Sequence, residues 1–305
     1  MLTDEEFRLF RNFIYEESGI YLKETRKDFL ENRLVKRMSA TGINSPYWYY
    51  RHVTQQKATE LLCLLDLLTV NETSFFRNKP QMDLFKGIIL SELIKKKESA
   101  GERRLRIWSA GCSTGEEPYT AAMIVLDSVP FIEKWDIKIF ASDLSLTALA
   151  SAAKGEYVIE KVNATVDDSY IGKYFEKINP PSSPFAKGGA WGIIERGGMG
   201  GLANPVAKPQ NGNYYYRVKD AVKKFVVFDF HNMKNDNGLR NLDVIFCRNV
   251  MIYFDMDEQK RLINKFYQNM NKGGYLLIGH AESLQGMNTG FQFMHNCGAT
   301  AYKKE

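Results

Sequence analysis

The stretch RLRIWSAGCSTGEEPYTAA, residues 104–122, decides the fold of this 305-residue chain. Its first seven residues are typical of a buried strand, and residues 116–127 predict a helix. Between them, Gly111 and Gly115 let the backbone turn tightly and approach a ligand closely. A strand, a glycine-containing turn and a helix in this order indicate a nucleotide-binding α/β unit.

The sequence after this unit continues the same alternation. Residues 137–142 predict a second strand that ends at Asp143, residues 243–247 a third and residues 275–279 a fourth. A helix is expected over 257–270, and residues 291–304 alternate as a terminal hairpin would. Strands that alternate with helices predict a parallel sheet with helices on both faces.

The N-terminal part has a helical pattern instead. Thr3 and Glu6 form a capping box ahead of an apolar face at helical spacing. A second helix is expected over about 24–40, ended by Gly42. The helix expected at 58–69 is apolar nearly all round, as a helix buried between two domains would be.

Residues 179–212 interrupt the α/β pattern. This stretch holds eight glycines and five prolines in 34 positions and has no sustained period. Because ordering so much glycine costs conformational entropy, we predict a flexible insertion between two strand-like segments, with a structured lid as the alternative. The second of those segments is expected at 214–218.

Composition excludes several classes of protein. The net charge of +5 is too small to indicate a nucleic-acid partner, and all of the excess comes from residues 179–224, with seven basic and two acidic side chains. No apolar run is long enough to cross a membrane, and the acidic N-terminus is unlike a secretion signal, so neither membrane insertion nor export is expected. The four cysteines never form a CxxC pair, which argues against a disulfide framework or a zinc ribbon and fits the cytoplasm.

The residues from Gly111 to Gly115 also match the G-x-S-x-G pattern of serine hydrolases, with Ser113 as the nucleophile. Two carboxylates, Glu116 and Glu117, follow directly, and negative charge beside a developing oxyanion is unfavourable. The same charge repels a pyrophosphate but suits a ligand that carries an ammonium and a sulfonium, namely S-adenosylmethionine. Asp143 is placed to accept hydrogen bonds from ribose hydroxyls, or alternatively to cap the following helix.

Four motifs together resemble the CheR-type chemotaxis receptor methyltransferases. They are NETSFFR at 71–77, SAGCSTGEEPY at 109–119, FASD at 140–143 and IFCRNVMIYFD at 245–255. The similarity runs in order through nearly the whole chain apart from 179–212.

The resemblance implies transfer of a methyl group from S-adenosylmethionine to glutamate side chains on chemoreceptor cytoplasmic helices. It also implies an α/β fold, in which a Rossmann-like methyltransferase domain at 71–305 follows an N-terminal helical docking domain at 1–70. A small antiparallel β-subdomain is expected at about 168–222, containing the insertion. The remaining alternatives are a cofactor-binding regulatory module with little activity and, more remotely, the hydrolase.

The resemblance also implies which residues bind the cofactor. These residues are Asn71, Thr73, Arg77, Glu117 (chosen over Glu116), Asp143, Asn232, Met233, Arg248 and Asn249. No metal is expected.

Arg77 and Tyr253 are the expected catalytic residues. A glutamate acceptor is already ionised at pH 7, so catalysis needs alignment and desolvation rather than a strong base. Arg77 can orient a carboxylate, and Tyr253, which matches the family's proposed catalytic tyrosine, can donate a hydrogen bond beside the methyl path. The alternatives are a surface salt bridge for Arg77 and a core aromatic for Tyr253.

Receptor docking is expected on the helix at 24–40. Arg26, Arg33 and Arg37 fall within about a 40° arc of it at ~100° per residue. The family docks acidic receptor helices on a basic face of this helix, whereas the alternative is a solvated basic edge. Some members also bind a receptor C-terminal pentapeptide at the β-subdomain, which the insertion puts in doubt here. We expect a monomer.

Overall fold

A computed structural model describes residues 2–179, 214–296 and 298–305. From residue 180 onward, the predicted insertion at 179–212 therefore lies outside the described residues. Within those described ranges, no helix is both long and apolar enough to cross a membrane.

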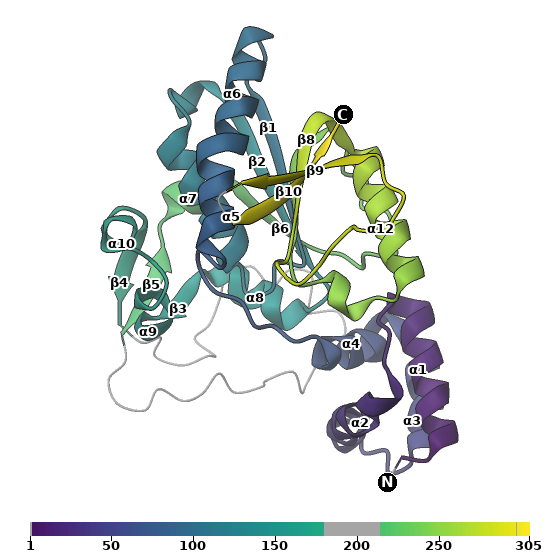
Figure 1. Ribbon diagram of the computed structural model, residues 1–305. Helices are drawn as coiled ribbons and strands as arrows, with labels where there is room; N and C mark the ends of the chain where they lie inside the picture. The colour runs from purple at the N-terminus through teal and green to yellow at the C-terminus, as the bar shows by residue number, and fades with distance from the viewer. Residues whose placement is uncertain (1, 180–213, 297) are drawn as a thin grey trace.

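The centre of the molecule is a seven-stranded mixed sheet in the order β6-β2-β1-β7-β8-β10-β9 (Figure 1). The first five strands in this order are parallel, and the last two pair antiparallel. The bounds are β1 Arg104–Ala110, β2 Asp136–Asp143, β6 Val226–Phe230, β7 Leu242–Cys247, β8 Met270–Ile278, β9 Phe291–Asn296 and β10 Ala299–Lys304. The predicted strands and the terminal hairpin are confirmed.

Alternate residues of the strands pack on opposite faces, because side chains of a strand alternate. On one face Ile107 and Phe246 join a core with the helices that flank β1 in sequence: α5 Lys79–Leu84, α6 Leu90–Ser99 and α7 Glu116–Ser128. On the other face Trp108 and Ile245 pack against α12 Met256–Asn269. The sheet is therefore covered on both sides, as predicted.

In the sheet, β1 lies between β2 and β7. The chain first adds strands on the β2 side of β1 and later adds strands on the β7 side. This reversal is a topological switch point, where ligands bind outside the carboxyl ends of the strands.

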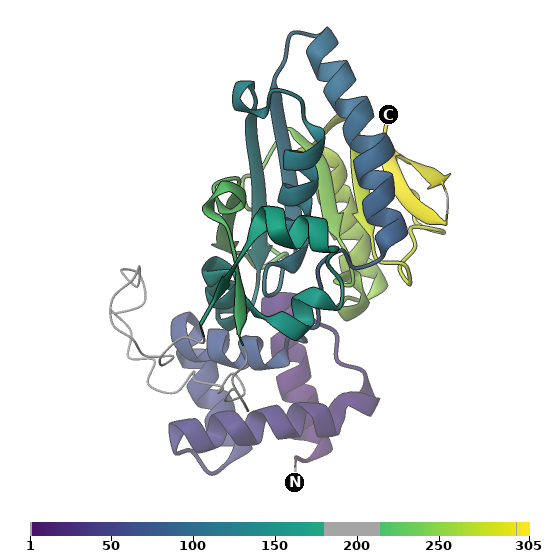
Figure 2. The ribbon, with the colours of Figure 1, turned by 90° about the vertical axis from the view of Figure 1, so that its left-hand side faces the viewer.

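Four N-terminal helices occupy that end of the molecule (Figures 1 and 2). They are α1 Asp4–Ser18, α2 Lys27–Thr41, α3 Pro46–Gln55 and α4 Leu62–Leu68. The Thr3–Glu6 capping box forms, and Gly42 ends α2 in a left-handed conformation, as predicted. A π-helical turn, Lys57–Leu61, precedes α4, and buried leucines of α4 pack into the N-terminal core.

A second, three-stranded antiparallel sheet in the order β3-β5-β4 flanks α7 and α8 Leu146–Lys154 (Figure 1). It is built from β3 Glu156–Val158, β4 Phe175–Ile178 and β5 Tyr215–Val218, with short helices α9 Ile159–Asn163, α10 Asp168–Tyr174 and α11 Asp220–Lys223. The predicted start of this subdomain, about residue 168, is too late, because β3 is only three residues long and gives no detectable alternation.

Candidate functional site

A cavity of about 930 Å³, counted out to its open mouth, lies at the carboxyl ends of β1, β2, β6 and β7. Helices α1 and α4 contribute Ser18 and Leu68 to its wall, so the N-terminal helices complete a pocket whose base is the sheet. All ten residues predicted to bind cofactor or catalyse line it: Asn71, Thr73, Arg77, Glu117, Asp143, Asn232, Met233, Arg248, Asn249 and Tyr253.

The turn after β1 shapes the base of the cavity. Gly111 has a φ of +82°, and a Cβ atom there would overlap the side chain of Val250 from the loop after β7. Ser113 also has a positive φ, +49°, and its N–H donates to Asp143 Oδ2 at 2.7 Å. The loop after β1 is therefore fastened to the end of β2.

Asp143 lies at one end of the pocket, held by two backbone donors. Besides Ser113, the N–H of Ser145 donates to Oδ1 at 2.8 Å. Burial raises the pKa of Asp143, and these hydrogen bonds oppose the rise because they favour the charged form. Asp143 is thus a fixed, desolvated acceptor, and its neighbour Ser145 caps α8, so Asp143 itself is not the cap.

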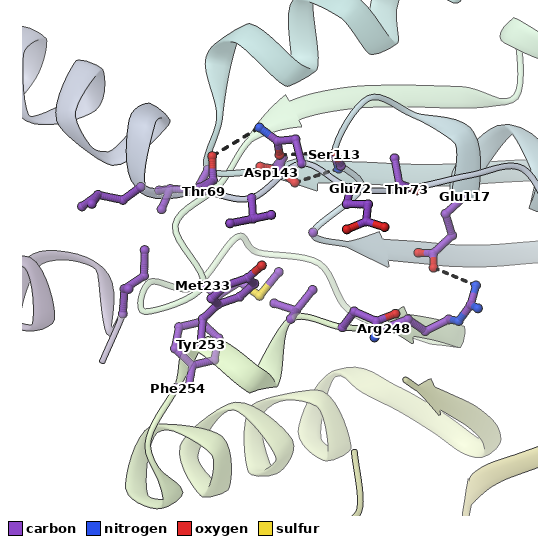
Figure 3. Close-up of a pocket in the computed structure, with 18 of the residues that line it drawn as sticks. Thr69, Glu72, Thr73, Ser113, Glu117, Asp143, Met233, Arg248, Tyr253 and Phe254 are labelled. Carbon is purple, nitrogen blue, oxygen red and sulfur yellow. Dashed lines mark hydrogen bonds and ion pairs between the residues drawn. The ribbon is translucent and has the colours of Figure 1, made fainter. Parts of the chain in front are cut away.

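The opposite end of the pocket holds an ion pair between Glu117 and Arg248 (Figure 3). Arg248 Nη1 lies 3.3 Å from Glu117 Oε2, and Ser109 donates its hydroxyl to Glu117 Oε1 at 2.6 Å. Burial raises the pKa of Glu117 and lowers that of Arg248, and the pairing opposes both shifts. Arg248 Nε is buried with no protein partner among the described residues.

Glu116 is separated from this pocket. It is fully buried, pairs with Lys161 and accepts a hydrogen bond from Thr114. Only Glu117 of the two lines the cavity.

Residues 71–77 cross the pocket between the N-terminal helices and α5. Asn71 Oδ1 accepts a hydrogen bond from Ser113 Oγ at 3.3 Å, and Arg77 donates to the carbonyl of Glu72 at 2.9 Å. Arg77 has no acidic partner among the described residues, so its charge is available to an anion.

Tyr253 lies beside Met233 and Phe254 in the close-up (Figure 3). Burial raises the pKa of Tyr253, while the positive charges of Arg26 and Arg77 oppose the rise. Its backbone carbonyl accepts a hydrogen bond from Tyr21 at 2.8 Å, which ties the chain between α1 and α2 to the pocket mouth.

Asn232 lines the pocket with its side chain already engaged. Its amide donates to the carbonyl of Glu17 at 2.6 Å and its Oδ1 accepts from Lys234 N. Contacts from this loop to a ligand would therefore come from its backbone and from Met233.

The docking prediction needs one correction, at Arg37. Its guanidinium is buried and forms two hydrogen bonds with Glu60, at 2.9 and 2.8 Å, while Tyr49 donates to the same carboxylate at 2.6 Å. Arg37 is therefore part of the helical core and is not available to a receptor. Arg26 is exposed and Arg33 is partly buried, with its Nε enclosed and without a partner among the described residues, and each guanidinium lies over Phe29.

The hydrolase alternative lacks a base. Ser113 donates its hydroxyl to Asn71, and no histidine bonds to it among the described residues. His280 and His295 are exposed and do not line the cavity. In the same described ranges, no group of three His, Cys, Asp or Glu side chains is arranged to hold a metal.

Sequence reasoning missed several supporting residues. Glu282 accepts hydrogen bonds from the N–H groups of Asn249 and Gly279, at 3.0 and 2.6 Å, and so fixes the loop after β7. Asp66 on α4 accepts hydrogen bonds from Ser145 and Thr147 at the start of α8. The position of Glu282 shortly after a predicted strand could have suggested a role at the sheet edge. No local sequence pattern indicates the role of Asp66.

Comparisons with known proteins agree with this geometry. Residues 71–187 and 203–299 match the family model described as CheR methyltransferase, SAM binding domain, and residues 5–69 match CheR methyltransferase, all-alpha domain. The chain is 31% identical to "Chemotaxis protein methyltransferase 2" of Vibrio cholerae, over 100% of this chain and 94% of that protein. It is 30% identical to "Chemotaxis protein methyltransferase" of Borreliella burgdorferi, over 93% and 90%, and 30% identical to that of Salmonella typhimurium, over 99% and 90%.

Proposed function

The chain belongs to the CheR methyltransferase family, and we propose that this S-adenosylmethionine-dependent methyltransferase esterifies glutamate side chains on cytoplasmic helices of chemoreceptors. The observation that carries the proposal is one cavity that brings together the buried Asp143, the ion pair of Glu117 and Arg248, and Arg77, which has no acidic partner among the described residues.

The pocket fits S-adenosylmethionine by its chemistry. Glu117 supplies negative charge for the α-ammonium, Asp143 supplies a fixed acceptor for ribose hydroxyls, and the buried Arg248 Nε is a donor without a protein partner among the described residues. Asn71, Thr73, the loop of Asn232 and Met233 after β6, and Asn249 in the loop after β7 would hold the rest of the molecule. When bound, the cofactor supplies an electrophilic methyl group on sulfur.

The mouth of the pocket would hold the acceptor. Arg77 would bind the substrate carboxylate, which is ionised at pH 7 and needs no general base. Tyr253, half-buried beside the same opening, would donate a hydrogen bond that fixes the orientation of the reacting oxygen. The rate would then depend on alignment and on exclusion of water.

Methyl transfer from labelled cofactor to a receptor cytoplasmic fragment tests the proposal. We expect labelled receptor whose label is released by mild alkali, because a glutamyl methyl ester hydrolyses readily. Label that survives alkali would exclude an ester, and cofactor binding without transfer would favour the regulatory module.

A further inference from the structure

Tyr157 in the small sheet contacts two separate segments of the cofactor pocket. It lies on β3, paired with Tyr216 of β5, and its side chain is 5% exposed. Its hydroxyl donates to the carbonyl of Thr114 at 2.7 Å, within the turn after β1. Its ring meets the ring of Phe75, in the segment 71–77, edge-on with centroids 4.8 Å apart.

The hydrogen bond from Tyr157 satisfies a carbonyl that lies outside helix α7. Thr114 precedes Gly115, the N-cap of α7, and the first helical hydrogen bond runs from the N–H of Tyr119 to the carbonyl of Gly115. The Thr114 carbonyl is therefore not part of the helical ladder, and Tyr157 supplies its hydrogen bond within the part-buried turn.

The loop that receives this bond has one residue with an unfavourable backbone. Ser113, next to Thr114, has a φ of +49°, whereas Gly115 on the other side adopts its φ of +94° without steric cost. Non-glycine residues in this region persist only where surrounding contacts hold them. Ser113 is held by Asp143 on one side, and Tyr157 holds the next residue on the other.

Phe75 extends the same contact to the second segment. It is fully buried and packs edge-on against Phe175 of β4 as well, at 5.3 Å. The small sheet thus contacts both the turn after β1, residues 111–115 (the glycine turn), and the segment that carries Asn71, Thr73 and Arg77.

We propose that Tyr157 is a positioning residue that holds these two segments in the geometry that binds S-adenosylmethionine, an inference that rests on the proposed function. It touches neither the cavity nor the reacting atoms, and it acts through the Thr114 carbonyl and the Phe75 ring.

Tyr157→Phe tests this inference, because it removes only the hydroxyl and keeps the ring. The matched control is Tyr119→Phe: Tyr119 is also buried, but its hydroxyl donates to the carbonyl of Ala152 on α8, at 2.8 Å, and not to a carbonyl of the turn after β1. We expect isothermal titration of the full-length protein with S-adenosylhomocysteine to give a Kd raised about 5-fold or more by Y157F, from the loss of one buried hydrogen bond, and within about 2-fold of wild type for Y119F.

Two further measurements separate positioning from general stability. In the ligand-free protein, Y157F should speed amide hydrogen exchange at Ser113–Gly115, and Y119F should not. At saturating cofactor, Y157F should keep its turnover on receptor while its KM for S-adenosylmethionine rises. If Y157F does not accumulate, Phe75→Leu should raise the same Kd.

The outcomes are distinct. Wild-type protein that fails to bind S-adenosylhomocysteine overturns the proposed function and this inference with it. Wild-type binding with an unchanged Kd in Y157F, or an equal change in Y119F, overturns the inference alone.

Discussion

Glu116 and Glu117 are neighbours in the sequence, but their carboxylates lie in different surroundings. Glu116 pairs with Lys161 of α9, and Glu117 pairs with Arg248 in the wall of the cavity. The helix α7 turns about 100° between them, so only one can point to the ligand.

Glu117→Gln should therefore weaken S-adenosylhomocysteine binding about tenfold or more, since a charge-assisted contact is lost. Because burial raises the pKa of Glu117, affinity should also decline on acidification at a higher pH than an exposed glutamate would give. Glu116→Gln, the control, should lower the melting temperature and leave the Kd unchanged. Calorimetric titration at several pH values measures the Kd of each variant, and thermal melts measure the stability. Equal losses of affinity in the two variants would contradict the assignment of Glu117, rather than Glu116, to the ligand.

A substitution at Gly111 tests whether cofactor binding depends on the shape of the pocket as well as on its charge. A Cβ atom there would overlap Val250 and require a φ near +82°, so Gly111→Ala should abolish detectable cofactor binding. Gly42 ends α2 with a similar φ of +72° but has no atom near the added Cβ. Gly42→Ala should cost only about 1 kcal/mol of unfolding free energy and keep the affinity, as titration and thermal melts would show. Normal binding by G111A would mean that the loop adjusts easily.

At the scale of elements, helix α2 carries two arginines with different roles. Arg37 belongs to the buried cluster with Glu60 and Tyr49, whereas Arg33 is partly buried and lies over Phe29, 4.7 Å from its ring centroid. The spacing of three arginines on one face indicates a basic stripe but does not tell which of them has an internal partner.

Arg33→Glu should raise the KM for receptor several-fold and leave the Kd for S-adenosylhomocysteine unchanged, because it reverses charge only on the proposed docking surface. Arg51→Glu applies the same reversal to exposed α3 and should leave the receptor KM near wild type. Arg37→Glu should instead destabilise the protein by about 3–5 kcal/mol, because it leaves Glu60 buried and unpaired. Steady-state kinetics and denaturant melts distinguish these results, and a receptor KM unaffected by R33E would remove α2 from docking.

Helix α7 is joined to the small sheet through Asp127. Lys86 and Lys173 pair with it at 2.8 and 2.5 Å, and these hydrogen bonds lower the pKa of Asp127 from 3.8 to about 2. A lowered pKa adds stability that is present above pH 4 and is lost as the pH falls toward 2.

Asp127→Asn should therefore reduce the free energy of unfolding by about 1 kcal/mol at pH 7, a value discounted for the partial exposure of the pair. The difference from wild type should shrink between pH 4 and pH 2, which urea titrations at several pH values would detect. A difference that stays constant over this range would show that the carboxylate charge does not contribute.

At the scale of the whole molecule, the N-terminal helices are bonded to the sheet on two sides of the cavity. On one side Asp66 of α4 accepts hydrogen bonds from Ser145 and Thr147, at 2.6, 3.1 and 2.7 Å. On the other, Lys234 donates to the carbonyls of Tyr15 and Glu16 at the end of α1, where a cation also suits the helix dipole. The pocket is therefore complete only when both layers are docked.

Asp66→Ala should lower the free energy of unfolding by about 2–3 kcal/mol and weaken S-adenosylhomocysteine binding, although Asp66 does not line the cavity. Asp66→Asn is the control, because its amide can satisfy the same hydroxyls once they reorient. Circular dichroism melts and titration of both variants check this, and unchanged affinity in D66A would show that the docking of α4 does not shape the pocket.

Local patterns in the sequence were sufficient for most strands of the large sheet and for their alternation with helices, whereas the residues that line the cavity followed from the resemblance carried by the four motifs. Strand and helix periods are properties of neighbouring residues, and the carboxyl ends of parallel strands meet at one edge, so the motifs after β1, β2 and β7 converge without further information.

Only the tertiary structure decided which side chains have internal partners. Arg37 meets Glu60 across 23 residues, Asp66 meets Ser145 across 79, and Tyr157 meets Thr114 across 43. Such pairs depend on how helices and sheets dock, which no local period encodes. The sequence alone thus determined the chemistry of this pocket, and packing between its layers determined which groups are free to perform that chemistry and which hold them in place.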